Sequence, residues 1–176
     1  MKNFKKLHIL LLSFLTFGCN GEHKKEIPVV SQVDLARFMG DWYVIASIPT
    51  FLEKNAHNGV ETYRQLDNGK IATTFTFRDG SFDGEKKIFH PVGTVQEGTG
   101  NAVWGMQYIW PIKADYRIIM LSEDYDITVI GRNQRDYVWI MARKPKIEDH
   151  IYSEILTFLS SHGYDIKKIK MVPQNW

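Results

Sequence analysis

Eight short segments rich in β-branched and aromatic residues follow one another along the chain, at intervals of roughly ten residues. Clusters of turn-forming residues separate them, and Asp67-Asn68-Gly69 in particular fits a tight hairpin. This spacing predicts a β-barrel or β-sandwich, not alternating strands and helices. The predicted strands are residues 41–49, 59–66, 70–78, 87–96, 102–109, 116–121, 127–132 and 137–143.

The C-terminal part of the chain has a helical period instead. One face of the predicted helix consists of Ile151, Ile155, Phe158, Leu159 and His162. Asp149 is placed to cap its start and Gly163 to end it. Because the polar face is acidic and carries serine, packing against the outside of the sheet is favoured over a membrane-surface or partner helix. Residues 166–172 could supply a ninth, short edge strand.

The first residues have the features of an export signal. Three lysines within the first six residues precede an apolar run over 7–17. That run is well short of the roughly 20 residues that a membrane-spanning helix needs. The sequence Leu-Thr-Phe-Gly-Cys over 15–19 resembles the cleavage box of bacterial lipoproteins. We therefore expect residues 1–18 to be a lipoprotein signal peptide.

Cys19 is the only cysteine in the chain, so it has no partner for an intramolecular disulfide. Its place at the signal boundary predicts a lipid anchor, with an ordinary signal and an incidental cysteine as the alternative. Asn20 is not the Asp that retains some bacterial lipoproteins in the inner membrane, which favours an outer-membrane anchor in a bacterial cell envelope. Residues 19–32 are predicted to form a flexible tether, and residues 33–176 the folded domain.

Composition and motifs argue against several classes of protein. The formal net charge is +2, and no Lys- or Arg-rich run follows the N-terminal region, so nucleic acid binding is not expected. The chain has no Gly-x-Ser-x-Gly motif and no phosphate-binding loop, so an enzyme is not expected. The six histidines lie apart without metal-ligand spacing, so neither a metal site nor a cofactor is expected.

Trp42, at the start of the first strand, and Arg143, at the end of the eighth, are predicted to close one end of a barrel. Gly40 precedes Trp42 in the same segment. A barrel that closes its last strand on its first must fill one end with side chains. A guanidinium over a Trp face suits this role and contributes roughly 0.5 to 2 kcal/mol. The opposite end can then stay open to a ligand.

These residues resemble the conserved regions of the lipocalin family. Gly40-Asp41-Trp42-Tyr43 is similar to the first region, Asp136-Tyr137 follows the second, and Arg143 occupies the third. Residues 138–145, with the predicted lipid anchor, are most similar to bacterial outer-membrane lipocalins and to apolipoprotein D. The resemblance implies an all-β fold, an eight-stranded antiparallel up-and-down barrel with one C-terminal α-helix packed outside. It also implies a small hydrophobic ligand, usually a fatty acid or lysophospholipid in the bacterial branch.

The side chains that face the interior follow from strand parity, because alternate residues point to opposite faces of a strand. Counting from Trp42 and Arg143, and from the aromatic residues of the third and fifth strands, we obtain one inward set. This predicted ligand-binding set is Val44, Ala46, Ile48, Phe75, Phe77, Trp104, Met106, Tyr108, Trp110, Tyr137, Trp139 and Met141. The methionines suit a ligand of variable shape, and the Tyr and Trp polar groups suit an interior that is not fully dry.

The loops at the two ends of the predicted barrel differ in charge. Residues 50–58, 78–87, 109–117 and 131–137 at the open end hold eight Lys or Arg and six Asp or Glu, a balance of +2. The turns of the closed end hold one Lys and five acids, a balance of −4. This difference favours an anionic head group at the mouth over a neutral or zwitterionic one.

Other functions remain open from the sequence. An eight-stranded barrel can be filled by its own side chains, which would suit a structural or adhesive envelope lipoprotein. A rigid ligand such as a terpenoid or haem is a further alternative, and Tyr108 is the one candidate for an axial haem ligand. We expect a monomer or a weak homodimer.

Overall fold

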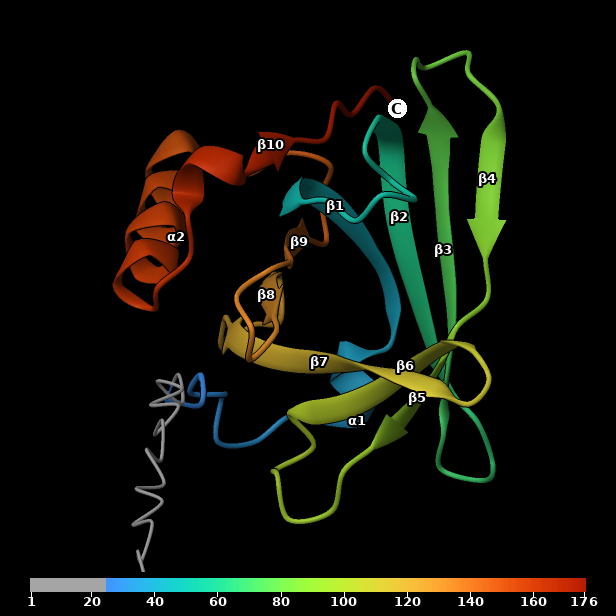
Figure 1. Cartoon of the computed structure of the whole chain (residues 1–176), viewed down its shortest axis with the longest axis vertical. Coiled ribbons are helices and arrows are strands. Elements are labelled where there is room, and N and C mark those ends of the chain that lie inside the picture. The colour runs from blue at the N-terminus through green and yellow to red at the C-terminus, as the bar shows by residue number, and fades with distance from the viewer. Residues whose placement is uncertain (1–24) are drawn as a thin grey trace, which may run out of the picture.

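The computed structural model describes residues 25–176 of the chain, and the predicted signal peptide and Cys19 lie outside the described residues. Antiparallel strands follow one another around a closed barrel, in which the last strand pairs with the first (Figure 1). The strands of the barrel are β1 (Gly40–Ile48), β2 (Ala56–Gln65), β3 (Ile71–Asp79), β4 (Lys86–Phe89), β5 (Val92–Val95), β6 (Val103–Ile109), β7 (Ile112–Leu121), β8 (Ile127–Gly131) and β9 (Val138–Ala142).

β4 and β5 together occupy one of eight positions around the barrel, because both pair with β3. The predicted strand over 87–96 is therefore interrupted at His90 and Pro91. Proline has no N–H to give to a ladder, although the carbonyl of Pro91 still accepts a hydrogen bond from Thr73 N at 3.0 Å. The prediction of an eight-stranded up-and-down barrel is confirmed.

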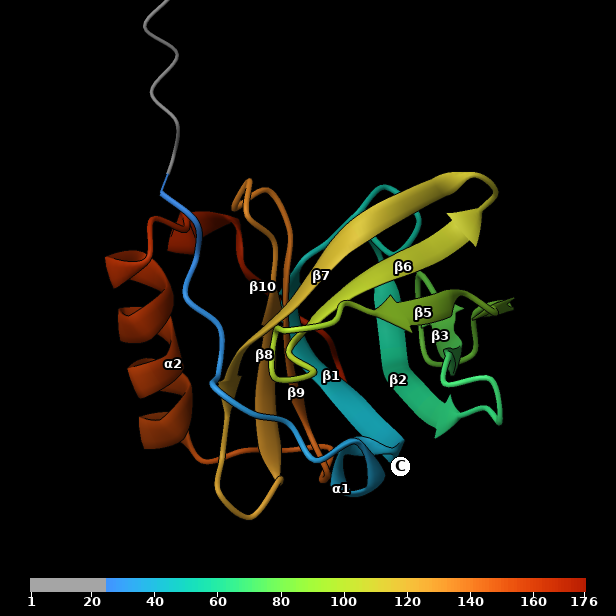
Figure 2. The same ribbon diagram turned by 90° about the horizontal axis from the view of Figure 1, so that it is seen from below.

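The β6–β7 hairpin is longer than the sequence pattern predicts. β7 begins at Ile112, where strand pairing was expected only from residue 116, and Ile109 pairs with Ile112 across the turn. Trp110 and Pro111 form the tip of this hairpin. The hairpin therefore projects beyond the neighbouring strands at one end of the barrel (Figure 2).

Helix α2 (Asp149–Ser161) packs outside the barrel, as predicted. Its buried residues Ile155 and Leu159 join an outer hydrophobic cluster with Ile140 of β9 and Val129 of β8. After the helix, a short turn η1 (Ile166–Lys168) leads to β10 (Lys170–Met171), which pairs with β1. The predicted ninth edge strand is therefore present but shorter than 166–172.

A bulge in β1 reverses the side-chain parity partway along the strand. The register of β1 against β9 shifts between Val44 and Ala46. Beyond the shift, Ala46 and Ile48 belong to the outer hydrophobic cluster that α2 covers, not to the interior. The prediction that Ala46 and Ile48 face the lumen is therefore wrong, because a bulge inserts one residue and parity counted from Trp42 does not survive it.

Residues 25–32 lie against the outside of the barrel, so the prediction of a flexible tether is wrong for this part of it. Ile27 is buried, and its N–H donates to Asn133 Oδ1 at 2.8 Å. Further along, Val30 N donates to the carbonyl of Ile118 at 3.1 Å. The segment runs from the end of the barrel that carries the β6–β7 hairpin to the opposite end, where it enters α1 (Leu35–Phe38) (Figure 2).

Candidate functional site

One end of the barrel is sealed by Arg143 and Trp42. The guanidinium carbon of Arg143 lies 3.8 Å from the centroid of the Trp42 ring. Its nitrogens donate to the carbonyls of Arg37, Phe38, Met39 and Asp41 at distances from 2.8 to 3.2 Å. The Trp42 indole N–H in turn donates to the carbonyl of Phe38 at 2.8 Å. Arg143 thus ties the last strand of the barrel to α1, which lies across the closed end.

Two local features make this seal possible. Gly40 has a φ of +94°, a conformation that side chains disfavour, and a Cβ at this position would lie 3.4 Å from Arg143 Nη1. Phe38, at the end of α1, is fully buried and packs on the rings of Trp42, Tyr63 and Trp104. The four-residue helix α1 was not recognised in the sequence, although Asp34 is a typical N-cap and accepts from Ala36 N at 2.9 Å.

The open end leads into a cavity of about 270 Å³. Five residues of the predicted ligand-binding set line it: Phe75, Met106, Tyr108, Tyr137 and Trp139. Residues outside that set complete the wall: Thr50, Phe51, Leu52, Glu53, Glu61, Phe89, Ile109, Ala114, Asp115, Tyr116 and Arg132. Most of these side chains are apolar or aromatic, as in sites that enclose small lipophilic molecules.

The other predicted ligand-binding residues lie elsewhere. Val44, Phe77, Trp104 and Met141 are buried in the core cluster that contains Trp42, and they do not line the cavity. Trp110 is 83% exposed at the tip of the β6–β7 hairpin. The barrel interior is therefore filled by its own side chains over part of its depth and hollow near the mouth.

Two buried carboxyl groups in the cavity wall were missed in the sequence. Glu61 and Glu53 are each only 6% exposed. Glu61 lies on β2 and accepts a hydrogen bond from the Tyr63 hydroxyl, which accepts one from Tyr116 at 2.8 Å. Burial raises the pKa of Glu61 to about 7. Strand parity counted from Tyr63 would have placed Glu61 on the inner face.

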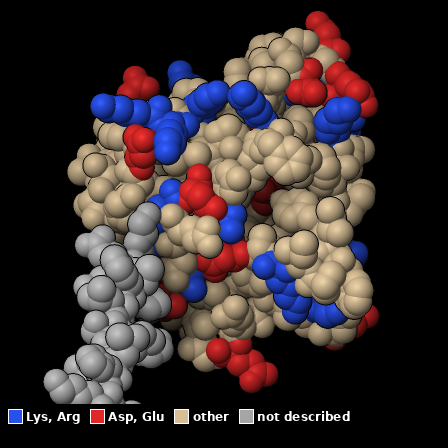
Figure 3. Space-filling view, viewed as in Figure 1, with Lys and Arg blue, Asp and Glu red and all other residues tan. Residues whose placement is uncertain are grey.

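Glu53 reaches the cavity from the loop between β1 and β2. Its carboxylate accepts from the Trp139 indole N–H at 3.1 and 3.2 Å and from Thr50 N at 3.0 Å. Burial raises the pKa of this carboxyl group, while the hydrogen bonds from Thr50 and Trp139 oppose the shift. Acidic side-chain atoms are visible inside a recess near the centre of Figure 3, surrounded mainly by uncharged surface.

Arg132 is the cationic residue of the cavity wall. Its Nη1 lies 3.3 Å from Asp136 Oδ2, and its guanidinium carbon lies 5.2 Å from the Tyr137 ring centroid. Its Nε is buried without a hydrogen-bond partner among residues 25–176. The lining thus combines one guanidinium with the carboxyl groups of Glu53, Glu61 and Asp115, so the basic excess expected for the mouth loops does not extend to the cavity wall.

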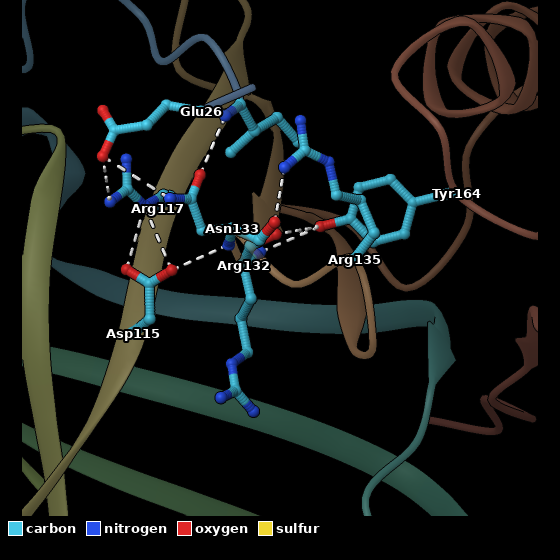
Figure 4. A network of polar contacts seen from close by, with 8 residues as sticks. Glu26, Asp115, Arg117, Arg132, Asn133, Arg135 and Tyr164 are labelled. Carbon is cyan, nitrogen blue, oxygen red and sulfur yellow. Dashed lines mark hydrogen bonds and ion pairs between the residues drawn. The ribbon is translucent and has the colours of Figure 1, made fainter. Parts of the chain in front are cut away.

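Asp115 belongs to a polar network on the side of the mouth (Figure 4). It accepts from Arg117 Nε at 2.9 Å and from Asn133 N at 2.7 Å. Asn133 also accepts from Ile27 N, and Arg135 Nη2 donates to the carbonyl of Lys25 at 2.7 Å. The network therefore fastens the N-terminal segment to the β8–β9 loop.

The described part of the chain holds no cluster of three or more His, Cys, Asp or Glu that could bind a metal. None of the helices within residues 25–176 is long and apolar enough to cross a membrane.

A closed up-and-down barrel, sealed at one end and open to an apolar cavity at the other, defines a protein that can enclose a small lipophilic molecule. Residues 33–174 match the family model of the lipocalin-like domain, and the chain belongs to the lipocalin family. Among solved structures, insecticyanin from the tobacco hornworm Manduca sexta has the same fold. It superposes with a TM-score of 0.66 at 16% identity and covers 84% of each chain.

Sequence relatives place the chain near the predicted branch of the family. It is 30% identical to temperature-induced lipocalin-1 of Arabidopsis thaliana, over 86% of this chain and 85% of the relative. It is 27% identical to outer membrane lipoprotein Blc of Escherichia coli (strain K12), over 92% of each chain. Apolipoprotein D of Mus musculus is 25% identical, over 84% of this chain and 80% of the relative. The predicted resemblance to bacterial outer-membrane lipocalins and apolipoprotein D is confirmed.

Proposed function

We propose that the protein binds a single-chain lipid, a fatty acid or a lysophospholipid, in the barrel cavity and stores or transports it. The observation that carries this proposal is the cavity of about 270 Å³, whose wall is mostly apolar and aromatic. The family relationship supports a lipophilic ligand held in a barrel. A filled structural barrel is disfavoured because the interior is hollow at the mouth.

The size of the cavity suits part of an acyl chain better than a bulky ligand. Ligand pockets commonly enclose about 300 to 1,000 Å³, and this one lies just below that range. Burying ten methylenes at about 0.8 kcal/mol each yields about 8 kcal/mol, from which ordering of the chain and protein subtracts. Met106 and Phe75, which border this space, would contact the chain.

The charges of the wall bear on where the head group lies. A carboxylate held beside Glu61 or Glu53 would be repelled whenever these groups are ionised. Arg132 offers donor groups of the opposite charge, including a buried Nε without a partner among the described residues. The proposal therefore places the acyl chain in the cavity and an anionic carboxylate or phosphate beside Arg132.

We further propose that the protein works in a bacterial cell envelope, held at the outer membrane by lipid on Cys19. The predicted lipoprotein box over 15–19 supports this location. The relative from E. coli is named an outer membrane lipoprotein, which supports it as well.

The ligand is identified by extracting the native protein with organic solvent and analysing the released molecules by mass spectrometry. Fatty acids or lysophospholipids in stoichiometric amount are expected, and a terpenoid or haem would instead support the rigid-ligand alternative. Quenching of Trp139 fluorescence by added lipids provides the binding curve. The variant Ala114→Phe, which fills part of the cavity without adding a tryptophan, should abolish this quenching, whereas Met171→Leu on the outer wall should not. No quenching at any chain length would contradict the proposal.

A further inference from the structure

Large apolar side chains are exposed together at the open end of the barrel. Phe51 is 85% exposed and Leu52 41% exposed in the loop after β1. Ile109, Trp110 and Ile112 are 72%, 83% and 70% exposed around the tip of the β6–β7 hairpin. Together these five residues form an apolar rim. An apolar group of this kind at the entrance of a site marks a surface that meets another apolar phase.

The closed end of the barrel has a different surface. Among residues 25–176, no large apolar side chain is exposed in its turns 66–70, 96–101 and 122–126. Outside the apolar rim, the exposed large apolar residues of the described chain are Phe82, Ile88, Tyr108, Ile166, Met171 and Trp176, and none of them is as exposed as Phe51, Ile109, Trp110 or Ile112. The rings of Trp176 and Tyr43 make a T-shaped, edge-to-face contact, with their centroids 5.3 Å apart. The apolar rim is therefore a property of the mouth and not of the whole surface.

The N-terminal segment enters at the same end as the rim. Lys25, the first described residue, is held by Arg135 of the β8–β9 loop. Figure 2 shows this point level with the β6–β7 hairpin tip and opposite α1. Only five residues lie between Cys19 and Lys25, and the six residue-to-residue steps that join them span about 20 Å at most. An acyl chain on Cys19 would therefore keep the mouth, not the closed end, near a membrane.

We propose that the apolar rim docks into the surface of a phospholipid bilayer, so that the mouth of the cavity opens onto lipid. A fluid bilayer suits the rim because Phe51 and the hairpin tip are separate projections on either side of an opening, and acyl chains adapt to both. Trp110 is of the residue type that favours the interface between lipid and water. Exposed Lys54 and Lys113, next to the rim residues, are placed to meet anionic head groups.

A second copy of the chain is the competing partner. A stable protein interface buries about 800 Å² on each side and needs complementary surfaces. Two projections with a cavity between them do not form a continuous surface of that kind.

Docking on lipid also has a consequence for the barrel, because a ligand would pass between bilayer and cavity without crossing water.

Intrinsic tryptophan fluorescence tests the docking. The full chain is reconstituted in vesicles of phosphatidylethanolamine and phosphatidylglycerol, with and without brominated phospholipid as a quencher. Of the five tryptophans, only Trp110 and Trp176 are highly exposed. Bromolipid should quench the wild-type emission, and Trp110→Phe should lose most of that quenching. The matched variant Trp176→Phe should retain most of the quenching by bromolipid.

Two results would overturn the proposal. One is the absence of bromolipid quenching in the wild-type chain, or its persistence in Trp110→Phe. The other is a dimer of the wild-type chain, detected by analytical sedimentation, that is converted to monomer in the double variant Trp110→Ser, Ile112→Ser. That result would show that the apolar rim binds a second copy of the chain. Neither residue lines the cavity, so ligand binding measured in detergent separates a failure of docking from a failure of the proposed function. Near-ultraviolet circular dichroism confirms that each variant is folded.

Discussion

The indole N–H of Trp139 on β9 donates to both carboxylate oxygens of Glu53, at 3.1 and 3.2 Å, across a separation of 86 residues. The bond crosses from the barrel wall to the loop that joins β1 to β2. That loop carries Phe51 and Leu52 at the mouth. The pair therefore sets the position of the mouth loop while keeping a carboxyl group inside the cavity wall.

Replacing Trp139 by Phe should destabilise the protein by about 1 to 3 kcal/mol, because Glu53 stays buried with fewer donors. Thr50 N still donates to the Glu53 carboxylate, which limits the loss. Urea denaturation of the wild type and variant measures this difference. Adding Glu53→Leu to Trp139→Phe should recover much of it, and a double variant no more stable than Trp139→Phe would contradict the explanation.

Arg143→Met should destabilise the protein by about 2 to 4 kcal/mol, because it removes the cation–π contact and several charged hydrogen bonds to carbonyls at the end of α1. Thermal unfolding measures the change. Arg37→Met is the matched control, because Arg37 also lies over a ring, 4.0 Å from the Tyr125 centroid, but at an exposed position. We expect that variant to lose less than about 1 kcal/mol. Equal losses would show that Arg143 does not seal the barrel.

Glu61 makes stability depend on pH in a defined direction. Burial raises its pKa from 4.5 to about 7, so between these values the folded state binds more protons than the unfolded state. The free energy of unfolding should therefore fall as pH rises from about 4.5 to 7 and then level off, by on the order of 3 kcal/mol. Glu61→Gln should remove much of this slope in denaturation measured across the range. An unchanged slope would show that Glu61 does not titrate in this window.

The same group should make lipid binding depend on pH. Above about pH 7 Glu61 is ionised, and its charge opposes a fatty acid carboxylate in the same cavity. Affinity for a fatty acid should fall as pH rises through 7, while affinity for its methyl ester should change little. Titration of Trp139 fluorescence measures both ligands. If the acid and the ester respond alike, the carboxylate does not approach Glu61.

Asn133→Ala should loosen the N-terminal segment without opening the barrel. Asn133 Oδ1 holds the N–H of Ile27 and Asn133 Nδ2 lies 3.5 Å from Glu26 Oε1. The Ile27 amide should exchange with deuterium faster in the variant, whereas amides of β2 should not. Asn68→Ala at the closed end is the control, because within residues 25–176 the Asn68 side chain bonds only to nearby Lys70 N. Unchanged exchange at Ile27 would show that other contacts hold the segment.

Local patterns in the sequence were sufficient for most of the fold. Most strand segments and helix α2 follow from residue spacing within about ten neighbours, with small shifts at their ends. The exceptions are the predicted strand over 87–96, which is divided into β4 and β5, and β7, which begins four residues earlier than predicted. The contact between Trp42 and Arg143 was also expected, because both sit at the ends of well-defined strands. Five residues that parity assigns to the inner face line the cavity, because alternate side chains of a strand share one face.

Parity failed where a local irregularity changed it. Because of the bulge after Val44, Ala46 and Ile48 lie on the outer face. Trp110 lies exposed at the tip of the β6–β7 hairpin, outside the barrel interior. Neither feature has a marked signature in the residues around it. The hydrogen bonds that fasten residues 25–32 join them to residues more than 80 positions away, so no local pattern predicted them.

The sequence by itself determined the order of strands, the outer helix and the family, because periodicity and turn chemistry act between near neighbours. Only the tertiary structure decided how much of the interior stays hollow, which carboxyl groups line it, and at which end the N-terminal segment and the apolar rim meet. These properties depend on packing between segments distant in the chain. A side chain's burial, its hydrogen-bond partners and its pKa are set by that packing and not by its neighbours in sequence.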